Sequence, residues 1–255
     1  MEKSYSVIQG FIEKNLNNKK VTFFTTGTVA RSAPDLLKRI HDDGHEIASH
    51  YNFHDLMFTQ DIQTIESNIL EAKNSIFKAV GEEPVGFRAP VFSIPKHRLD
   101  IFELLSKHFS YDSSYVLKLS EDEYQNYQEE VPFNIDNFLE VPVITKKYFH
   151  NKLQMKSGGT FFRFFTKKMI KDAMLYSHDN GYPPLIYLHP YDYLQDREFW
   201  VDSKYFLKNI NLKNSIKYFR QIQWIGIGNK SVFPKLEYLL EHFEHQGPMK
   251  MLLDK

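Results

Sequence analysis

The sequence predicts an α/β fold in which helices cover a mostly parallel sheet, closed in the manner of a β/α barrel. Short β-branched and aromatic segments alternate with segments of helical periodicity along most of the 255 residues. Four of the apolar segments end in a polar residue, at His50, Arg88, Asp112 and His189. In a β/α barrel, residues at the carboxyl ends of the strands meet at one face, where such enzymes carry out their chemistry. The pattern therefore predicts a barrel with an active site.

Helical periodicity, with apolar residues three or four positions apart, predicts six helices. The clearest places apolar residues from Ile62 to Ala79 on one face and ends at Gly81, a typical helix cap. Pro34 favours a helix start, with Ser32 as the candidate cap. The helices are expected at 4–17, 34–40, 61–80, 96–107, 166–179 and 231–244.

Strands are predicted where β-branched or aromatic runs stop at a glycine, a proline or a polar residue. The segment 118–137 is charged and Asn-rich without a clean period, which predicts an excursion loop. The strands are expected at 21–27, 45–50, 85–90, 110–114, 139–144 and 184–190.

No internal repeat, low-complexity tract or linker interrupts the chain, which favours one domain over residues 1–255 with a helical C-terminal part at 200–255. Basic and acidic residues balance at 32 each, which argues against a general nucleic-acid binder. The absence of cysteine excludes disulfides and favours a reducing, cytoplasmic location. The sequence also lacks an apolar leader and any apolar run of about 18 residues, so neither export nor a membrane span is expected.

His50 and His54, four positions apart, are candidate metal ligands because imidazole is a common ligand for zinc. Two histidines need at least one further ligand, often a carboxylate. In a chain with 11 histidines such a pair also arises by chance. The other three strand-end residues have structural alternatives as well: a surface cation, a helix cap and a core histidine. Their equivalent positions after four strands favour an active site over four independent accidents.

Six stretches of the chain, which occur in the order that the family has, resemble the polysaccharide deacetylase family. The domain of this family is a distorted β/α barrel of the nodulation chitooligosaccharide deacetylase type. They run from about residue 20 to 195 and resemble most closely a branch associated with bacterial surface polysaccharides. The stretches are VTFFTTGTVARSAPDLLKRIHDDGHEIASH, the His50–His54 pair, GFRAPVFSI, FSYDSSY, GGTFFRFF and YLHPYD.

The resemblance implies a role for each candidate residue. His50 and His54 match the family's metal-binding histidines, with zinc the expected divalent metal. Arg88 matches the arginine that holds the catalytic base. His189 matches the catalytic histidine, which is the general acid, and Asp112 matches the aspartate that orients this histidine. The implied reaction is hydrolysis of an N-acetyl group on a carbohydrate substrate, with metal-activated water as the nucleophile.

The chain departs from the family at its start. The family begins with a strand that carries paired acids, one the base and one the third metal ligand, whereas this chain begins at a helix. We expect an incomplete reading frame or a degenerate member, with Asp55 and Asp192 as candidate substitute carboxylates. A barrel that lacks this strand exposes two edges, which predicts poor solubility or oligomerisation.

Two interpretations remain open. The run Phe161–Phe165 is expected to lie in the core, although aromatic faces also stack against sugar rings. Two alternatives to a polysaccharide deacetylase keep the same scaffold. One is a catalytically silent carbohydrate-binding or assembly protein, and the other is a hydrolase of another small amide. His45 and Glu46 are interpreted as structural.

Overall fold

The computed structural model describes residues 1–95, 97–118, 135–148, 153–196, 199, 203–208 and 210–254, so most of the predicted loop at 118–137 lies outside the described residues. The sequence predicted one domain, and the chain divides into two compact units. The sheet unit comprises Asn18–Thr145 and His245–Lys255, and the helical unit comprises Met1–Asn17 and Lys146–Glu244. No helix in the described part of the chain is long and apolar enough to cross a membrane.

The sheet unit contains a five-stranded parallel sheet with the order β1-β2-β3-β4-β6. The strands β3, β4 and β6 contain only two residues each. All five coincide with predicted strands, and the parallel order confirms the predicted α/β class. The strands are β1 (Thr22–Thr25), β2 (Glu46–Ser49), β3 (Gly86–Phe87), β4 (Tyr111–Asp112) and β6 (Leu139–Glu140).

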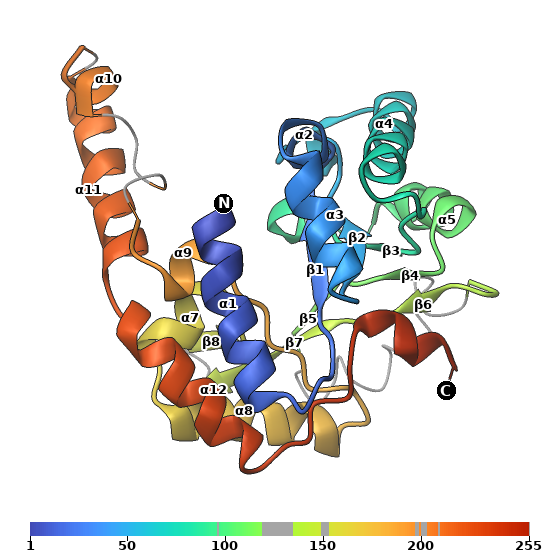
Figure 1. Cartoon of the computed structure of the whole chain (residues 1–255). Helices are drawn as coiled ribbons and strands as arrows, with labels where there is room; N and C mark the ends of the chain where they lie inside the picture. Colours follow the sequence, from blue (N-terminus) through green and yellow to red (C-terminus); the bar gives the residue numbers. More distant parts are fainter. Residues whose placement is uncertain are drawn as a thin grey trace. The chain divides into compact units, whose positions relative to one another are not determined.

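Helices α2 to α5 flank this sheet (Figure 1). The predicted amphipathic helix is α4, where Asp61 caps the N-terminus and Gly81 closes the C-terminus at a φ of 81°. Its inward face, from Ile65 to Ile76, is fully buried. The N-cap of α3 is Ala33 rather than the predicted Ser32, because residues up to Ser32 form the separate helix α2. The helices are α2 (Gly27–Ser32), α3 (Pro34–Asp42), α4 (Ile62–Val80) and α5 (Leu99–His108).

Beyond β4 the sheet unit adds β5 (Val116–Lys118), which pairs in parallel with the start of β7 (Val143–Tyr148). β7 continues into the helical unit, which also holds β8 (Leu153–Lys156).

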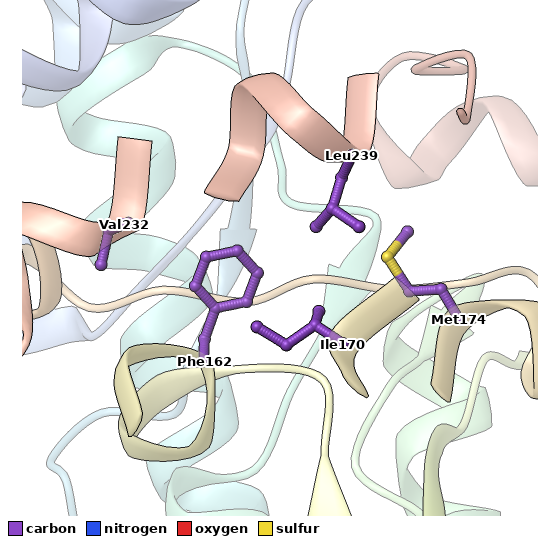
Figure 2. Close-up of a cluster of buried hydrophobic side chains, with 5 residues drawn as sticks. All are labelled: Phe162, Ile170, Met174, Val232 and Leu239. Atoms are coloured by element: carbon purple, nitrogen blue, oxygen red, sulfur yellow. The ribbon is translucent and has the colours of Figure 1, made fainter. Parts of the chain in front are cut away.

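The helical unit encloses a compact apolar core (Figure 2). Phe162 and Ile170 are fully buried there and meet Val232 and Leu239 from the C-terminal helix. The predicted helices at 166–179 and 231–244 are therefore both present and pack together. The helices are α1 (Glu2–Asn15), α7 (Gly159–Phe164), α8 (Lys167–Asp179), α9 (Pro190–Tyr193), α10 (Ser203–Lys208), α11 (Leu212–Gly226) and α12 (Val232–Leu240).

The predicted strand at 184–190 is wrong. In the structure this segment makes one isolated parallel bridge, from Tyr187 to Gly158, and α9 begins at Pro190. Pro183 and Pro184 lack a backbone N–H, so the start of this segment cannot donate to a ladder of hydrogen bonds.

Candidate active site

His50 lies directly after β2, where the chain turns sharply away from the sheet. Its backbone N–H donates to Thr25 O at 2.7 Å, which is the last parallel contact with β1. Tyr51 then adopts a φ of 70°, a left-handed conformation that is costly for a large side chain and is held here by complete burial of the ring. The turn brings the His54 ring to 5.3 Å from the His50 ring, measured between centroids.

The orientation of His50 is set by a backbone carbonyl. Its Nδ1 lies 2.6 Å from Arg88 O. A carbonyl only accepts, so Nδ1 carries the proton and the neutral ring presents its lone pair at Nε2. Metal-bound histidines are commonly fixed in this way by a hydrogen bond from the other ring nitrogen. The His50–His54 pair therefore fits two corners of a metal site.

A third ligand does not join this pair in the described part of the chain, where no three His, Asp or Glu side chains are grouped to hold a metal ion. Asp55, a predicted substitute, lies at an exposed position in the loop after His54. That His50 and His54 bind a metal ion stays a prediction.

Arg88 is buried beneath the same turn. Its Nε donates to Ser113 O at 3.1 Å and its Nη2 to Ser113 Oγ at 2.8 Å. Its guanidinium carbon also lies 4.2 Å from the centroid of the Phe24 ring. These contacts hold the cation at the carboxyl ends of β3 and β4, while its predicted role of holding a catalytic carboxylate remains a prediction.

Asp112 forms a buried acid pair with Glu140, which the sequence analysis missed. The parallel register of β4 and β6 sets the two residues side by side. Ser114 Oγ donates to Asp112 Oδ1 at 2.6 Å, and the Tyr115 N–H donates to Glu140 Oε1 at 3.1 Å. The remaining oxygens, Asp112 Oδ2 and Glu140 Oε2, have no further hydrogen-bond partner among the described residues. One proton shared between them satisfies both.

Burial, followed by the negative charge of Asp112, raises the pKa of Glu140 well above its usual range. Burial also raises the pKa of Asp112. Both shifts favour the protonated form of the pair. A glutamate between apolar neighbours in a predicted strand was the signal that could have identified this group.

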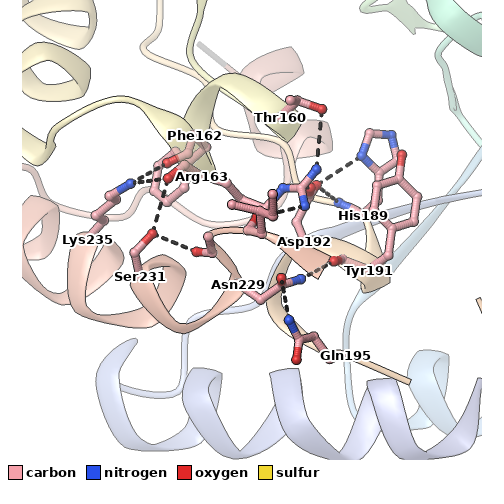
Figure 3. Close-up of polar contacts among 12 residues, drawn as sticks. Thr160, Phe162, Arg163, His189, Tyr191, Asp192, Gln195, Asn229, Ser231 and Lys235 are labelled. Carbon is pink, nitrogen blue, oxygen red and sulfur yellow. Dashed lines mark hydrogen bonds and ion pairs between the residues drawn. The ribbon is translucent and has the colours of Figure 1, made fainter. Parts of the chain in front are cut away.

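His189 sits at the entrance to α9 in the helical unit, and its side chain is 40% exposed. Asp192 Oδ2 accepts from the His189 backbone N–H at 2.8 Å and lies 3.0 Å from His189 Nδ1. Asp192 Oδ1 forms an ion pair at 2.8 Å with Arg163 Nε, and both of those side chains are fully buried (Figure 3). Asp192, a predicted substitute metal ligand, is thus engaged with Arg163 and His189 inside its own unit.

Two glycines allow the chain to pass close to this histidine. A Cβ on Gly158 would overlap the Tyr187 ring and lie 2.5 Å from Tyr187 O. Gly159 has a φ of 56° and donates its N–H to Tyr187 O at 2.9 Å. The Gly-Gly pair therefore fixes the segment that leads into His189.

The aromatic run is divided between two environments. Phe162 is buried in the core as expected, whereas Phe164 is 50% exposed. Arg163 was missed as a site residue, although an arginine within four phenylalanines is expected to be buried with a charged partner.

An open apolar groove with a volume of about 420 Å³ lies in the sheet unit, between residues 56–58 and residues 91–97. Phe58 and Val91 on its rim are 50% and 61% exposed. Val91 and Phe92 have φ values of 57° and 55°, which are unusual for bulky side chains and indicate local strain. Strained backbone of this kind concentrates at functional sites.

Comparison with known proteins defines the class. Residues 14–107 match the polysaccharide deacetylase family, and residues 116–252 match a domain of unknown function, DUF3473. The chain therefore carries a polysaccharide deacetylase family domain over residues 14–107, followed by a DUF3473 domain over residues 116–252.

Among curated relatives, the chain is 31% identical over 94 residues to peptidoglycan-N-acetylglucosamine deacetylase PgdA of Listeria monocytogenes, covering 36% of this chain and 20% of that protein. It is 34% identical over 119 residues to peptidoglycan deacetylase-like protein FGM2 of Gibberella zeae, covering 46% of this chain and 33% of that protein. The chain thus spans only a minor part of the relatives that it matches.

Solved structures confirm the fold as the distorted barrel type. A structure from Mycobacterium smegmatis assigned as a polysaccharide deacetylase has a TM-score of 0.58 at 17% identity, covering 98% of this chain and 76% of that one. The protein BA3943 from Bacillus anthracis, described as a CE4 family pseudoenzyme, has a TM-score of 0.51 at 14% identity, covering 99% of this chain and 61% of that one.

Proposed function

We propose that this chain is a metal-dependent hydrolase that removes acetyl groups from N-acetylated sugars of a bacterial surface polysaccharide. The observation that carries the proposal is the His50–His54 pair, in which the carbonyl of Arg88 orients the His50 lone pair at Nε2. Family membership and the peptidoglycan deacetylases among its relatives support the reaction and the substrate class.

In this proposal His50 and His54 bind a divalent metal, with zinc expected. When bound, the metal polarises the acetyl carbonyl and activates a water molecule. His189 donates a proton to the leaving amine, so that the amide C–N bond breaks to give acetate and a free amino sugar. The apolar groove beside Phe58 and Val91 is suited to the apolar face of a pyranose ring.

A second candidate is a catalytically silent carbohydrate-binding or assembly protein. It is favoured by the grouping of only two candidate ligands in the described residues. BA3943, a pseudoenzyme of the same fold, gives a precedent for loss of activity on this scaffold. The two candidates differ in acetate release rather than in sugar binding.

Zinc titration tests the metal site. We expect isothermal titration of the 255-residue chain to show a weak binding event. Loss of one of three protein ligands should lower the zinc affinity by more than the roughly 10–100-fold that is typical when a residue that supports a ligand is lost. His50→Ala should abolish the event, and His178→Ala, on the exposed face of α8, should leave it unchanged. A tight site that survives His50→Ala would contradict the assignment.

Acetate release separates the two candidates. We expect little release from N-acetylglucosamine oligomers by the chain alone, because general-base catalysis contributes about 10²–10⁴ in rate. Release should rise when a family-type strand with an acidic pair is added before Met1. In that protein His189→Ala should lower turnover and retain zinc, whereas His54→Ala should lose both. Oligomer binding without release in either form would favour the silent protein.

A further inference from the structure

We infer that Asp192 and Arg163 are positioning residues for His189, which hold its imidazole in the tautomer with the proton on Nδ1 and direct Nε2 to the reacting group. The catalytic part of this inference rests on the proposed function, whereas the tautomer is a property of the chain itself.

A single carboxylate oxygen anchors both the backbone and the ring of His189. Asp192 Oδ2 accepts from the backbone N–H at 2.8 Å and lies 3.0 Å from Nδ1. An ionised carboxylate only accepts hydrogen bonds, so Nδ1 carries a proton in both the neutral and the charged imidazole. The first turn of α9 sets this geometry, because Asp192 is its third residue and caps the helix at His189.

Arg163 keeps the Asp192 carboxylate in place. A fully buried carboxylate is costly without a partner, and Arg163 Nε lies 2.8 Å from Asp192 Oδ1. The same guanidinium donates to Ile227 O at 3.2 Å from Nη1 and to Thr160 Oγ1 at 3.4 Å from Nη2. Three contacts in different directions fix its plane (Figure 3). Removing it would leave the aspartate charge buried and unbalanced.

Two aromatic rings restrict rotation of the imidazole. Tyr191 stacks on His189 with centroids 4.8 Å apart and planes inclined by 6°. Tyr187 meets it edge-on at 6.0 Å and 88°. Asn229 Nδ2 donates to Tyr191 O at 2.5 Å and so holds the stacked residue in place. The ring is therefore fixed by one hydrogen bond and two aromatic contacts while 40% of the side chain stays accessible.

The arrangement gives His189 a defined direction of proton transfer. The charged ring gives its Nε2 proton to the leaving amine, the C–N bond breaks, and the Nδ1 proton stays on the hydrogen bond to Asp192. The resemblance assigned the orienting role to Asp112. In the structure Asp112 accepts from Ser114 and lies beside Glu140, whereas Asp192 contacts His189 directly.

Nuclear magnetic resonance of the full chain labelled with ¹⁵N-histidine tests the inference without any need for activity. Long-range ¹H–¹⁵N correlations, with His189→Gln to assign the signals, should show His189 protonated at Nδ1 at a pH where the ring is neutral. In Asp192→Asn the charged Arg163 guanidinium should hold the amide oxygen more strongly than the neutral His189 backbone N–H does. The NH₂ group then faces Nδ1, and the tautomer should switch to Nε2–H. The matched control Asp112→Asn should leave the tautomer of His189 unchanged.

Three results would overturn the inference: an Nε2–H tautomer in the unmodified chain, no change in Asp192→Asn, or a switch in Asp112→Asn. If Asp192→Asn does not melt cooperatively, the unmodified chain and Asp112→Asn decide the question. In the extended, active protein Asp192→Asn should lower kcat and leave KM and zinc binding unchanged. Absence of deacetylation would refute the proposed function but would leave the tautomer result standing.

Discussion

Two pairs of buried ionisable residues, one in each unit, are compensated within the pair, which explains how these polar groups are tolerated in the two cores. Arg163 and Asp192 neutralise one another with both side chains fully buried. Asp112 and Glu140 instead share a proton, because two adjacent carboxylates in a dry environment cannot both ionise. An ion pair gives a permanent arrangement, whereas a shared proton makes the structure sensitive to pH.

The acid pair makes stability fall as the pH rises above the pKa that a carboxyl has in the unfolded chain. A carboxyl whose pKa is higher in the folded chain than in the unfolded chain stabilises the fold at low pH, below its unfolded pKa of about 4.3. This stabilisation is lost as the pH rises through the pKa of the folded chain. Burial and the charge of Asp112 raise the pKa of Glu140, so the stabilisation should be lost at pH values above about 4.3.

We expect Glu140→Gln, which keeps the shape and the neutral state, to flatten the decline of Tm as the pH rises from about 4.3 to 9. Relative to the unmodified chain, its Tm at pH 9 should be higher by about 2–4 °C for each kcal/mol of repulsion removed. Scanning calorimetry across this range measures the effect. Glu241→Gln, at an exposed position, is the matched control. Parallel curves for Glu140→Gln and the unmodified chain would contradict the shared proton.

At the scale of elements, short strands and tight turns determine where the functional side chains emerge. β3 and β4 contain two residues each, so Arg88 and Asp112 lie at or directly after a strand end. The segment before His189 is held by a single bridge rather than by a ladder. Its position therefore depends on close backbone packing against the Gly-Gly pair.

Gly158→Ala should destabilise the helical unit strongly. The new methyl group would overlap the Tyr187 ring and lie 2.5 Å from Tyr187 O, so backbone must move. Core overpacking of this kind costs about 1–3 kcal/mol. Gly10→Ala in α1 is the control, because nothing lies within 4 Å of its Cβ and alanine favours a helix by about 1 kcal/mol. Urea unfolding measures both, and an unchanged midpoint for Gly158→Ala would refute the packing argument.

At the scale of the whole molecule, two compact units and two family matches divide the chain, and the boundaries do not coincide. The deacetylase match covers 14–107 and the DUF3473 match covers 116–252, whereas the sheet unit extends to Thr145 and takes back His245–Lys255. The C-terminal segment belongs to the sheet unit because Met249 N–H donates to Thr22 Oγ1 at 2.7 Å and Lys250 N–H to Glu46 Oε2 at 3.1 Å.

The outer strand of the sheet predicts self-association. In the described residues β1 pairs with β2 on one side only, and open strand edges pair readily with other chains. We expect the 255-residue chain to sediment as oligomers whose size increases with concentration. Addition of a family-type strand with an acidic pair before Met1 should shift the distribution toward monomer. A monodisperse monomer of the unextended chain at all concentrations would show that this edge is protected.

Local patterns were sufficient for much of the fold. The period of apolar residues in α4 and its Gly81 cap predicted that helix to within a residue, because one amphipathic face and one cap define it. The five strands of the parallel sheet were likewise placed from composition. The strand at 184–190 was predicted wrongly because its apolar composition outweighed the missing donors of its prolines.

The sequence by itself determined the α/β class, the family and the residues available for chemistry, since these follow from local periodicity and short motifs. Only the tertiary structure decided which of those residues are partners. Asp112 and Glu140 are brought together by the register of β4 and β6. Arg163 and Asp192 meet through the packing of α7 and α9. Pairings across 28 or 29 positions depend on how elements pack, and no local pattern encodes that distance.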